Sequence, residues 1–185
     1  MPTKLVQTFA ERESLEALRA DLAVVIPGTV KGGFKVLRKD VLGVISASSM
    51  LRRRSRTTAA GTGFATNSTI GQVADASVFA SGDVLKAGDG TTIGTVLTVD
   101  PTATPNAVTL TANAAVAVAA SGVVVASDGS QVAACIADQE SDGTGDTTIN
   151  IFISGLLKEA ILRGLDATAK SELGGRSLPG GIFKF

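Results

Sequence analysis

The sequence predicts a mainly β protein. Of its 185 residues, 21 are glycine and only 18% are charged, a composition that favours short strands and tight turns. Short runs of Val, Ile, Thr and Leu recur between turns that contain Gly, Asp or Asn, which is typical of a small barrel or sandwich. A chain of this length holds one large domain or two small ones and can bury a proper core.

Residues 131–155 carry the clearest local pattern, that of a β-hairpin. Two apolar runs, at 132–137 and 147–153, flank a connection in which Asp142-Gly143 and Gly145-Asp146 supply turn chemistry. Both arms are expected to be partly buried around a rather long acidic loop. The single cysteine, Cys135, lies within the first run, where an inert buried thiol is favoured over a nucleophile.

The N-terminal segment predicts a helix from about residue 9 to residue 24. Thr8 and Glu11 fit a capping box, and Pro27-Gly28 ends the pattern. The apolar positions recur at helical spacing: Leu15, Leu18, Leu22 and Val25. This apolar face either packs on its own domain or acts as an arm that docks on a partner, and both interpretations stay open.

Strands are expected over most of the remaining chain. A tight turn at Lys39-Asp40 separates two of them, and the segment 82–100 predicts a further hairpin. Near the C-terminus, Asp166 caps a short helix that runs through Leu173. The last residues, 182–185, form a short strand that closes its own sheet or extends a neighbour's edge.

The charges balance over the whole chain but not along it. The 17 basic and 17 acidic residues cancel, so no overall field favours nucleic acid or a membrane surface. The first third is basic and includes the triple Arg52-Arg53-Arg54, whereas residues 87–157 contain acidic but no basic side chains. A triple Arg is able to contact phosphate. Without interleaved aromatics or a nucleic-acid motif, the pattern favours a solvated strand face or a protein-docking patch.

No segment has the pattern of a membrane span. The uncharged run at 101–127 is interrupted by Pro, Asn and Gly well before about 20 apolar residues have accumulated. The first residues contain no hydrophobic signal core. The chain is therefore expected to be soluble.

The sequence contains no recognisable catalytic constellation. With no histidine and one cysteine, neither a Ser-His-Asp or Cys-His arrangement nor a Cys-rich zinc site can form. An acidic loop has some likeness to a calcium loop: Asp138, Glu140, Asp142 and Asp146. Ile149 stands at the twelfth position, where such a loop needs a bidentate Glu, so a plain acidic turn is favoured. We therefore expect no enzyme activity, no cofactor and no metal.

Four separated segments follow a pattern found together in one family. They are Val41-Leu42-Gly43, Ala133 to Asp138, Ile151 to Gly155 and Gly181 to Phe183. With the acidic loop and the short helix between them, they resemble the head decoration (capsid cement) proteins of tailed bacteriophages. Cys135 departs from the small residue usual in that family, and the segment before Pro27 is longer than the pattern needs.

This resemblance implies a mainly β fold with a β-tulip-like core. The core would span residues 28–80 and 128–185, with an N-terminal arm and helix over 1–27 and an inserted small β-barrel or sandwich over 81–127. The chain would sit on the outer surface of the virion capsid, bind the major capsid protein and brace neighbouring capsomers as an oligomer, often a homotrimer. No nucleic acid and no membrane is expected as a partner. Candidate contacts with the capsid lie in the arm and the basic segment: Leu5, Phe9, Leu15, Leu18, Leu22, Arg52, Arg53 and Arg54.

Two other functions stay open. One is a tail or baseplate adaptor, because small β-barrels with acidic loops also occur there. The other is a carbohydrate- or ligand-binding β module. The absence of Trp and Tyr counts against sugar binding, since sugars usually stack on aromatic faces.

Overall fold

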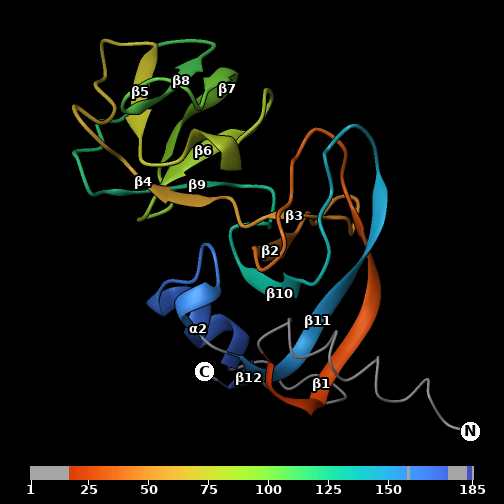
Figure 1. The fold of residues 1–185 in the computed structure, drawn as a ribbon. Coiled ribbons are helices and arrows are strands. Elements are labelled where there is room, and N and C mark those ends of the chain that lie inside the picture. The colour runs from red at the N-terminus through yellow and green to blue at the C-terminus, as the bar shows by residue number, and fades with distance from the viewer. Residues whose placement is uncertain (1–16, 158, 175–182, 185) are drawn as a thin grey trace, which may run out of the picture. The chain divides into compact units, whose positions relative to one another are not determined.

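The computed structural model describes residues 17–157, 159–174 and 183–184 (Figure 1). In this part the chain is mainly β, as the sequence predicts, and its strands form two sheets. The chain divides into two compact units, residues 1–42 with 133–185 and residues 43–132. Among the described residues, no helix is both long enough and apolar enough to cross a membrane.

The first sheet has the strand order β1-β3-β2-β10-β11-β12, and β1 also pairs with β11. Five of its strands therefore close into a barrel. The barrel strands are β1 (Ala17–Val30), β2 (Val41–Val44), β3 (Leu51–Arg53), β10 (Ala133–Ala137) and β11 (Thr147–Leu157). The sixth strand of the sheet, β12 (Phe183–Lys184), pairs with β11.

The hairpin predicted over residues 131–155 is confirmed. β10 and β11 pair antiparallel, with Ile136 opposite Phe152, and every residue of β10 is buried, Cys135 included. The strand predicted just before Lys39-Asp40 is less regular than expected. Val36 makes only an isolated bridge to Ser141, and the Lys39 amide donates to the Ala137 carbonyl at 2.8 Å.

β1 corrects the predicted N-terminal helix. Residues 17–24 were expected to be helical but belong to the strand, while residues 1–16 lie outside the described part. β1 pairs antiparallel with β11, from Val25 opposite Phe152 to Val30 opposite Thr147. Its β-branched residues suit this long pairing, and the tertiary contact overrides the helical spacing of the leucines.

Pro27 was interpreted as a helix stop but lies inside β1, opposite Asn150. Proline has no N–H to contribute to a sheet. Asn150 directs its own amide to Oε1 of Gln139 and its carbonyl to the Asp138 amide, both at 3.0 Å. Because the hydrogen-bonding groups of Asn150 point toward the β10 side, this position tolerates a proline in β1.

The C-terminal predictions are confirmed where the structure describes them. α2 (Ala167–Gly174) follows the 3-10 helix η2 (Glu159–Ile161). Asp166 caps α2, because its Oδ1 accepts a hydrogen bond from the Ala169 amide at 2.6 Å. β12 pairs in parallel with β11 and so extends the chain's own sheet. The Ala133 amide donates to the Glu172 carboxylate at 2.7 Å, which ties α2 to the start of β10.

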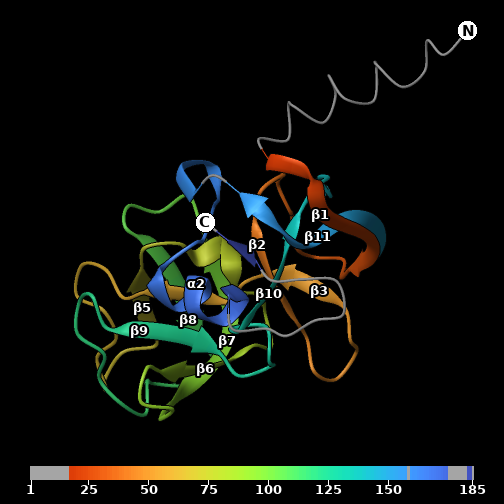
Figure 2. The same cartoon turned by 90° about the horizontal axis from the view of Figure 1, so that it is seen from below.

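The second sheet has the order β4-β9-β6-β7-β8-β5, and its neighbouring strands pair antiparallel. It curls into a half-barrel around the core of the second unit (Figure 2). Its strands are β4 (Arg56–Thr58), β5 (Ile70–Val73), β6 (Val84–Ala87), β7 (Thr92–Asp100), β8 (Asn106–Leu110) and β9 (Val123–Ala126), with the 3-10 helix η1 (Ala76–Val78) between β5 and β6. The hairpin predicted at 82–100 is therefore confirmed as β6 and β7.

The second unit is larger than the predicted insertion. The insertion was placed at residues 81–127, whereas the unit spans 43–132. β4 and β5 precede residue 81, yet they pair with β9 and β8 in the same sheet. These partners lie far apart in sequence, and local patterns do not indicate such pairings. The β-tulip character of the core stays a prediction.

Candidate functional site

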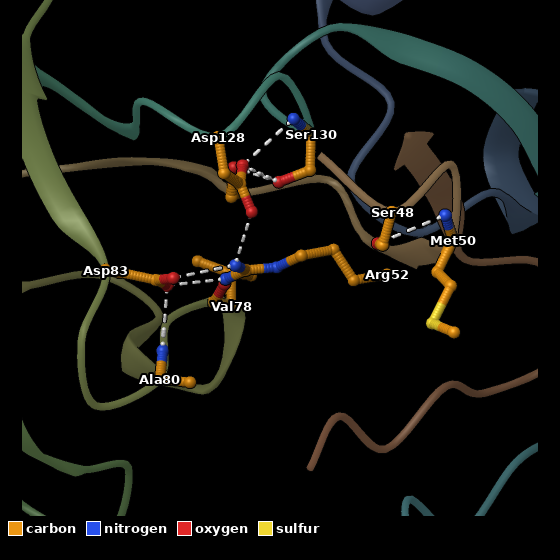
Figure 3. A network of polar contacts seen from close by, with 9 residues as sticks. Ser48, Met50, Arg52, Val78, Ala80, Asp83, Asp128 and Ser130 are labelled. Atoms are coloured by element: carbon orange, nitrogen blue, oxygen red, sulfur yellow. Dashed lines mark hydrogen bonds and ion pairs between the residues drawn. The ribbon is translucent and has the colours of Figure 1, made fainter. Parts of the chain in front are cut away.

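Arg52, a member of the predicted docking patch, lies at the centre of a polar cluster inside the second unit (Figure 3). Its guanidinium contacts Asp83 with both terminal nitrogens, Nη1 at 2.9 Å and Nη2 at 2.7 Å. Nη1 also lies 2.9 Å from Oδ2 of Asp128, and Nη2 donates to the Val78 carbonyl. The residue is only 1% exposed. Such a two-pronged, desolvated contact is the strongest form of Arg–carboxylate pairing.

The two carboxylates are themselves held in place. Oδ2 of Asp83 accepts a hydrogen bond from the Ala80 amide at 2.9 Å. Oδ1 of Asp128 accepts from the amide and hydroxyl of Ser130, at 3.0 and 2.5 Å. The Ser130 hydroxyl also lies 2.7 Å from the Ser55 hydroxyl, and both serines are buried. The cluster is therefore a continuous polar network that joins segments distant in the sequence.

The neighbouring arginines also bind within the second unit. Arg53 pairs with Asp75 at 3.0 Å and donates to the Ser77 hydroxyl at 2.6 Å. Arg54 is 4% exposed, and its Nε donates to the Gln131 carbonyl at 3.0 Å. The expectation of a solvated basic face is thus wrong for Arg52 and Arg54.

The physical reason lies in sequence separation. The anionic partners of Arg52 stand 31 and 76 residues further along the chain. Counting charges over a short window finds a basic segment and misses these partners. Because the guanidinium of Arg52 is occupied by two carboxylates and a carbonyl, it is not offered to an external phosphate. We interpret the cluster as a structural tie of the second unit.

Several aspartates of the chain form the same kind of local turn. In five Asp-x-Ser or Asp-x-Thr segments, the Asp carboxylate accepts a hydrogen bond from the amide two residues later, at 2.9–3.0 Å. Such turns are a known preference of Asp. The five aspartates are Asp75, Asp89, Asp100, Asp128 and Asp142. The spacing is visible in the sequence, but the turn at Asp142-Gly143 was predicted from its glycine and not from this spacing.

These hydrogen bonds lower the pKa of four of the carboxyl groups. For Asp89 and Asp142 the main cause is the hydrogen bond from the backbone amide of Thr91 or Thr144, and for Asp100 it is the hydroxyl of Thr102. Burial raises the pKa of Asp75, but the hydrogen bonds from Ser77 and the charge of Arg53 together outweigh it and lower the pKa. Each carboxylate therefore stabilises the folded chain in its ionised form.

Acid is expected to destabilise the protein in a defined direction. The four pKa values lie below the ordinary value of 3.8, so their contribution is complete above pH 3.8 and is lost as the pH falls through the folded-state values. The free energy of unfolding, measured by urea titration from pH 7 to pH 2, should stay level and then decline below about pH 4.

A pair of substitutions tests whether these turns cause the decline. Asp89→Asn and Asp100→Asn keep an oxygen acceptor but remove the titrating group, so the decline should be shallower in the double variant. A decline identical to that of the unmodified chain would show that other groups dominate acid unfolding.

The acidic loop of the hairpin does not gather its carboxylates at one point. Asp142 binds the Thr144 amide at 2.9 Å, while Asp146 accepts from the Gly32 amide at 2.8 Å. Asp138 instead pairs with Arg38 at 3.7 Å. In the described part of the chain, no three His, Cys, Asp or Glu side chains are arranged to hold a metal ion.

The remaining contact candidates lie at the N-terminus. Leu18 and Leu22 belong to β1, a strand of the barrel, instead of the predicted helix. Three others lie outside the described residues: Leu5, Phe9 and Leu15. Their contact with a partner stays a prediction.

An exposed apolar surface on the second sheet was not found from the sequence. Ile70, Leu97 and Val84 expose 55%, 51% and 37% of their areas, although all three lie in strands. Ile70 is opposite Thr109, and Thr109 is opposite Thr98 on its other side. An irregularity in the pairing between Val96 and Thr98 turns Leu97 outward as well.

The register therefore places these side chains on one face, which we call the outer sheet face. Val84 joins it because it lies opposite Thr95 in the adjacent strand pair. The face comprises Ile70, Val84, Thr95, Leu97, Thr98 and Thr109. The outer sheet face cannot be predicted from alternating apolar residues in the sequence, because the bulge in β7 interrupts that alternation.

Comparison with models of protein families, with curated proteins and with solved structures finds no match to this chain.

Proposed function

We propose that this chain is a structural virion protein that binds the outer surface of a phage capsid and stabilises contacts between capsomers. One observation supports the proposal most. The four segments that carry the resemblance to head decoration proteins contribute to β2, β10, β11 and β12, which are consecutive neighbours in the first sheet. The segments at 41–43 and 133–138, which are 90 residues apart in the sequence, thus supply adjacent strands, as a shared fold requires and a chance likeness does not.

The proposal assigns the chain the major capsid protein as partner, further copies of itself in the homotrimer implied by the resemblance, and no catalytic step. The hydrogen-bonding groups of the described arginine cluster are directed inward, and the barrel and half-barrel supply rigid β structure. A cement protein needs rigidity and complementary surfaces, and many weak contacts repeated on a symmetric shell add up to firm binding.

Electron microscopy tests the proposal directly. Heads and tails of the phage that encodes this chain, produced without it, are mixed with the purified full chain. We expect added density at repeated positions on the outer face of the head. Density on the tail or baseplate alone would support an adaptor instead, and density on neither would reject both functions.

The N-terminal segment is expected to contribute to capsid binding. A deletion of residues 1–27 would remove most of β1 and open the barrel, so the deletion must end at residue 16. The chain that lacks residues 1–16 should occupy fewer capsid sites at equal concentration, measured by co-sedimentation with heads.

Thermal melting of the shortened chain provides the control, because β1 remains. An unchanged melting temperature with reduced occupancy supports a contact role for this segment. Unchanged occupancy would place the contact elsewhere and contradict this part of the proposal.

A further inference from the structure

Three Asp-Gly steps in the chain share the same local structure. They are Asp89-Gly90-Thr91, Asp128-Gly129-Ser130 and Asp142-Gly143-Thr144. In each, the Asp carboxylate accepts a hydrogen bond from the backbone amide two residues later, at 2.9–3.0 Å. An Asp-Gly step is chemically reactive, because glycine has no side chain to hinder attack by its amide nitrogen on the preceding carboxyl group.

The reaction is an isomerisation of the backbone, without oxidation or reduction. The glycine nitrogen loses its proton and attacks Cγ of the aspartate, so that a C–N bond forms and one carboxyl oxygen leaves as water. A second water then opens the cyclic imide. Opening at Cγ restores aspartate, whereas opening at the former backbone carbonyl leaves the chain joined through Cγ, as isoaspartate.

The glycine amides distinguish the two Asp-Gly-Thr steps. Asp89 and Asp142 are both exposed, and each binds the amide of its threonine, so the two carboxyl groups are closely matched. The Gly90 amide donates to the Ala87 carbonyl at 2.9 Å, a hydrogen bond that is lost when the nitrogen is deprotonated. The Gly143 amide makes a long, weaker contact of 3.4 Å with the Ser141 hydroxyl. Attack by the Gly143 nitrogen therefore breaks less.

The third step is restrained at its carboxylate. Oδ2 of Asp128 lies 2.9 Å from Nη1 of Arg52, and Oδ1 accepts hydrogen bonds from the amide and hydroxyl of Ser130. This pairing fixes the orientation of the carboxylate and opposes the loss of one of its oxygens as water.

We propose that Asp142-Gly143 is a site of spontaneous isoaspartate formation in the folded chain. Isoaspartate adds one methylene group to the backbone next to Gly143, whose carbonyl accepts from the Gly33 amide at 2.8 Å. The modified loop should pair less well with residues 33–36, so the modified chain should melt at a lower temperature. The inference is independent of the capsid role, because it concerns the chemistry of the purified chain.

Peptide mapping measures isoaspartate at each step after the full chain has been kept at neutral pH and body temperature for several weeks. Trypsin leaves the three steps on one fragment, since residues 87–157 contain no basic side chain, so the chain is cut after Leu110 and after Glu140. Isoaspartate should accumulate about five times faster at residue 142 than at residue 89, the effect of one hydrogen bond, and more slowly still at residue 128.

A pair of variants identifies the source of the isoaspartate. Asp142→Glu should lose most of it, because glutamate would have to form a larger ring. Asp89→Glu is the matched control, because the same change in the same tripeptide should leave most of the isoaspartate in place.

Unfolding separates an effect of the fold from an effect of the sequence. In concentrated urea, both Asp-Gly-Thr steps should isomerise at similar rates. Three results would overturn the inference: equal rates at residues 89 and 142 in the folded chain, a difference that persists unchanged in urea, and no isoaspartate at residue 142. None of these bears on capsid binding, and a failure to bind capsids would leave the isomerisation rates as they are.

Discussion

Replacing Arg52 by methionine is expected to lower the free energy of unfolding by about 3–5 kcal/mol. The substitution removes the guanidinium but keeps an unbranched stem, so the loss comes from the carboxylates of Asp83 and Asp128, which lose their cation. Both carboxylates are partly exposed, and their hydration places the result toward the lower end of that range. Chemical denaturation at neutral pH measures the change.

Arg53→Met is the matched control for this prediction. Arg53 also pairs with an aspartate, but it and Asp75 are both more exposed than Arg52. An ion pair of this kind contributes less than about 1 kcal/mol. If both substitutions lowered the free energy of unfolding by the same amount, burial of the Arg52 cluster would not be what stabilises the second unit.

Replacing Gly43 by alanine is the second substitution for which we expect a large effect. The added Cβ would lie 1.9 Å from the carbonyl oxygen of Ser130 and 2.7 Å from its Cα. Ser130 cannot move away freely, because its carbonyl accepts from the Ser55 amide at 3.2 Å and its hydroxyl belongs to the arginine cluster. Overpacking against backbone should destabilise the chain by about 3 kcal/mol or more, measured by the same denaturation.

Gly145→Ala shows whether the effect of Gly43→Ala is specific. No atom lies within 4 Å of a Cβ built at Gly145, and its backbone does not require glycine. The free energy of unfolding should therefore change by no more than about 0.5 kcal/mol. A Gly43→Ala variant as stable as Gly145→Ala would contradict the close approach of β2 to Ser130.

Local patterns predicted much of the fold correctly. The hairpin of β10 and β11 was visible because strand formers flank Asp-Gly turns. The cap of α2 was visible because Asp166 stands just before a short helical run. In each case the interactions that decide the structure lie within a few residues, so the sequence shows both partners together.

The features that the sequence patterns did not predict depend on pairing between residues far apart in the chain. β1 has leucines at helical spacing, and only its register with β11 makes it a strand. The partners of Arg52 lie 31 and 76 residues away, so a buried cluster looked like a basic surface. The outer sheet face depends on the bulge near Leu97 and on two cross-strand registers. One signal was available and unused, the repeated Asp-x-Ser/Thr spacing that marks five turns.

The number of copies bound to each capsid tests the proposed function most directly. Increasing amounts of the full chain are added to heads produced without it, the heads are pelleted, and the bound chain is measured. The proposal predicts saturation at a fixed number of copies per head, because the shell offers a fixed set of equivalent positions. Binding that rises without saturation, or a chain that stays in the supernatant, would contradict it.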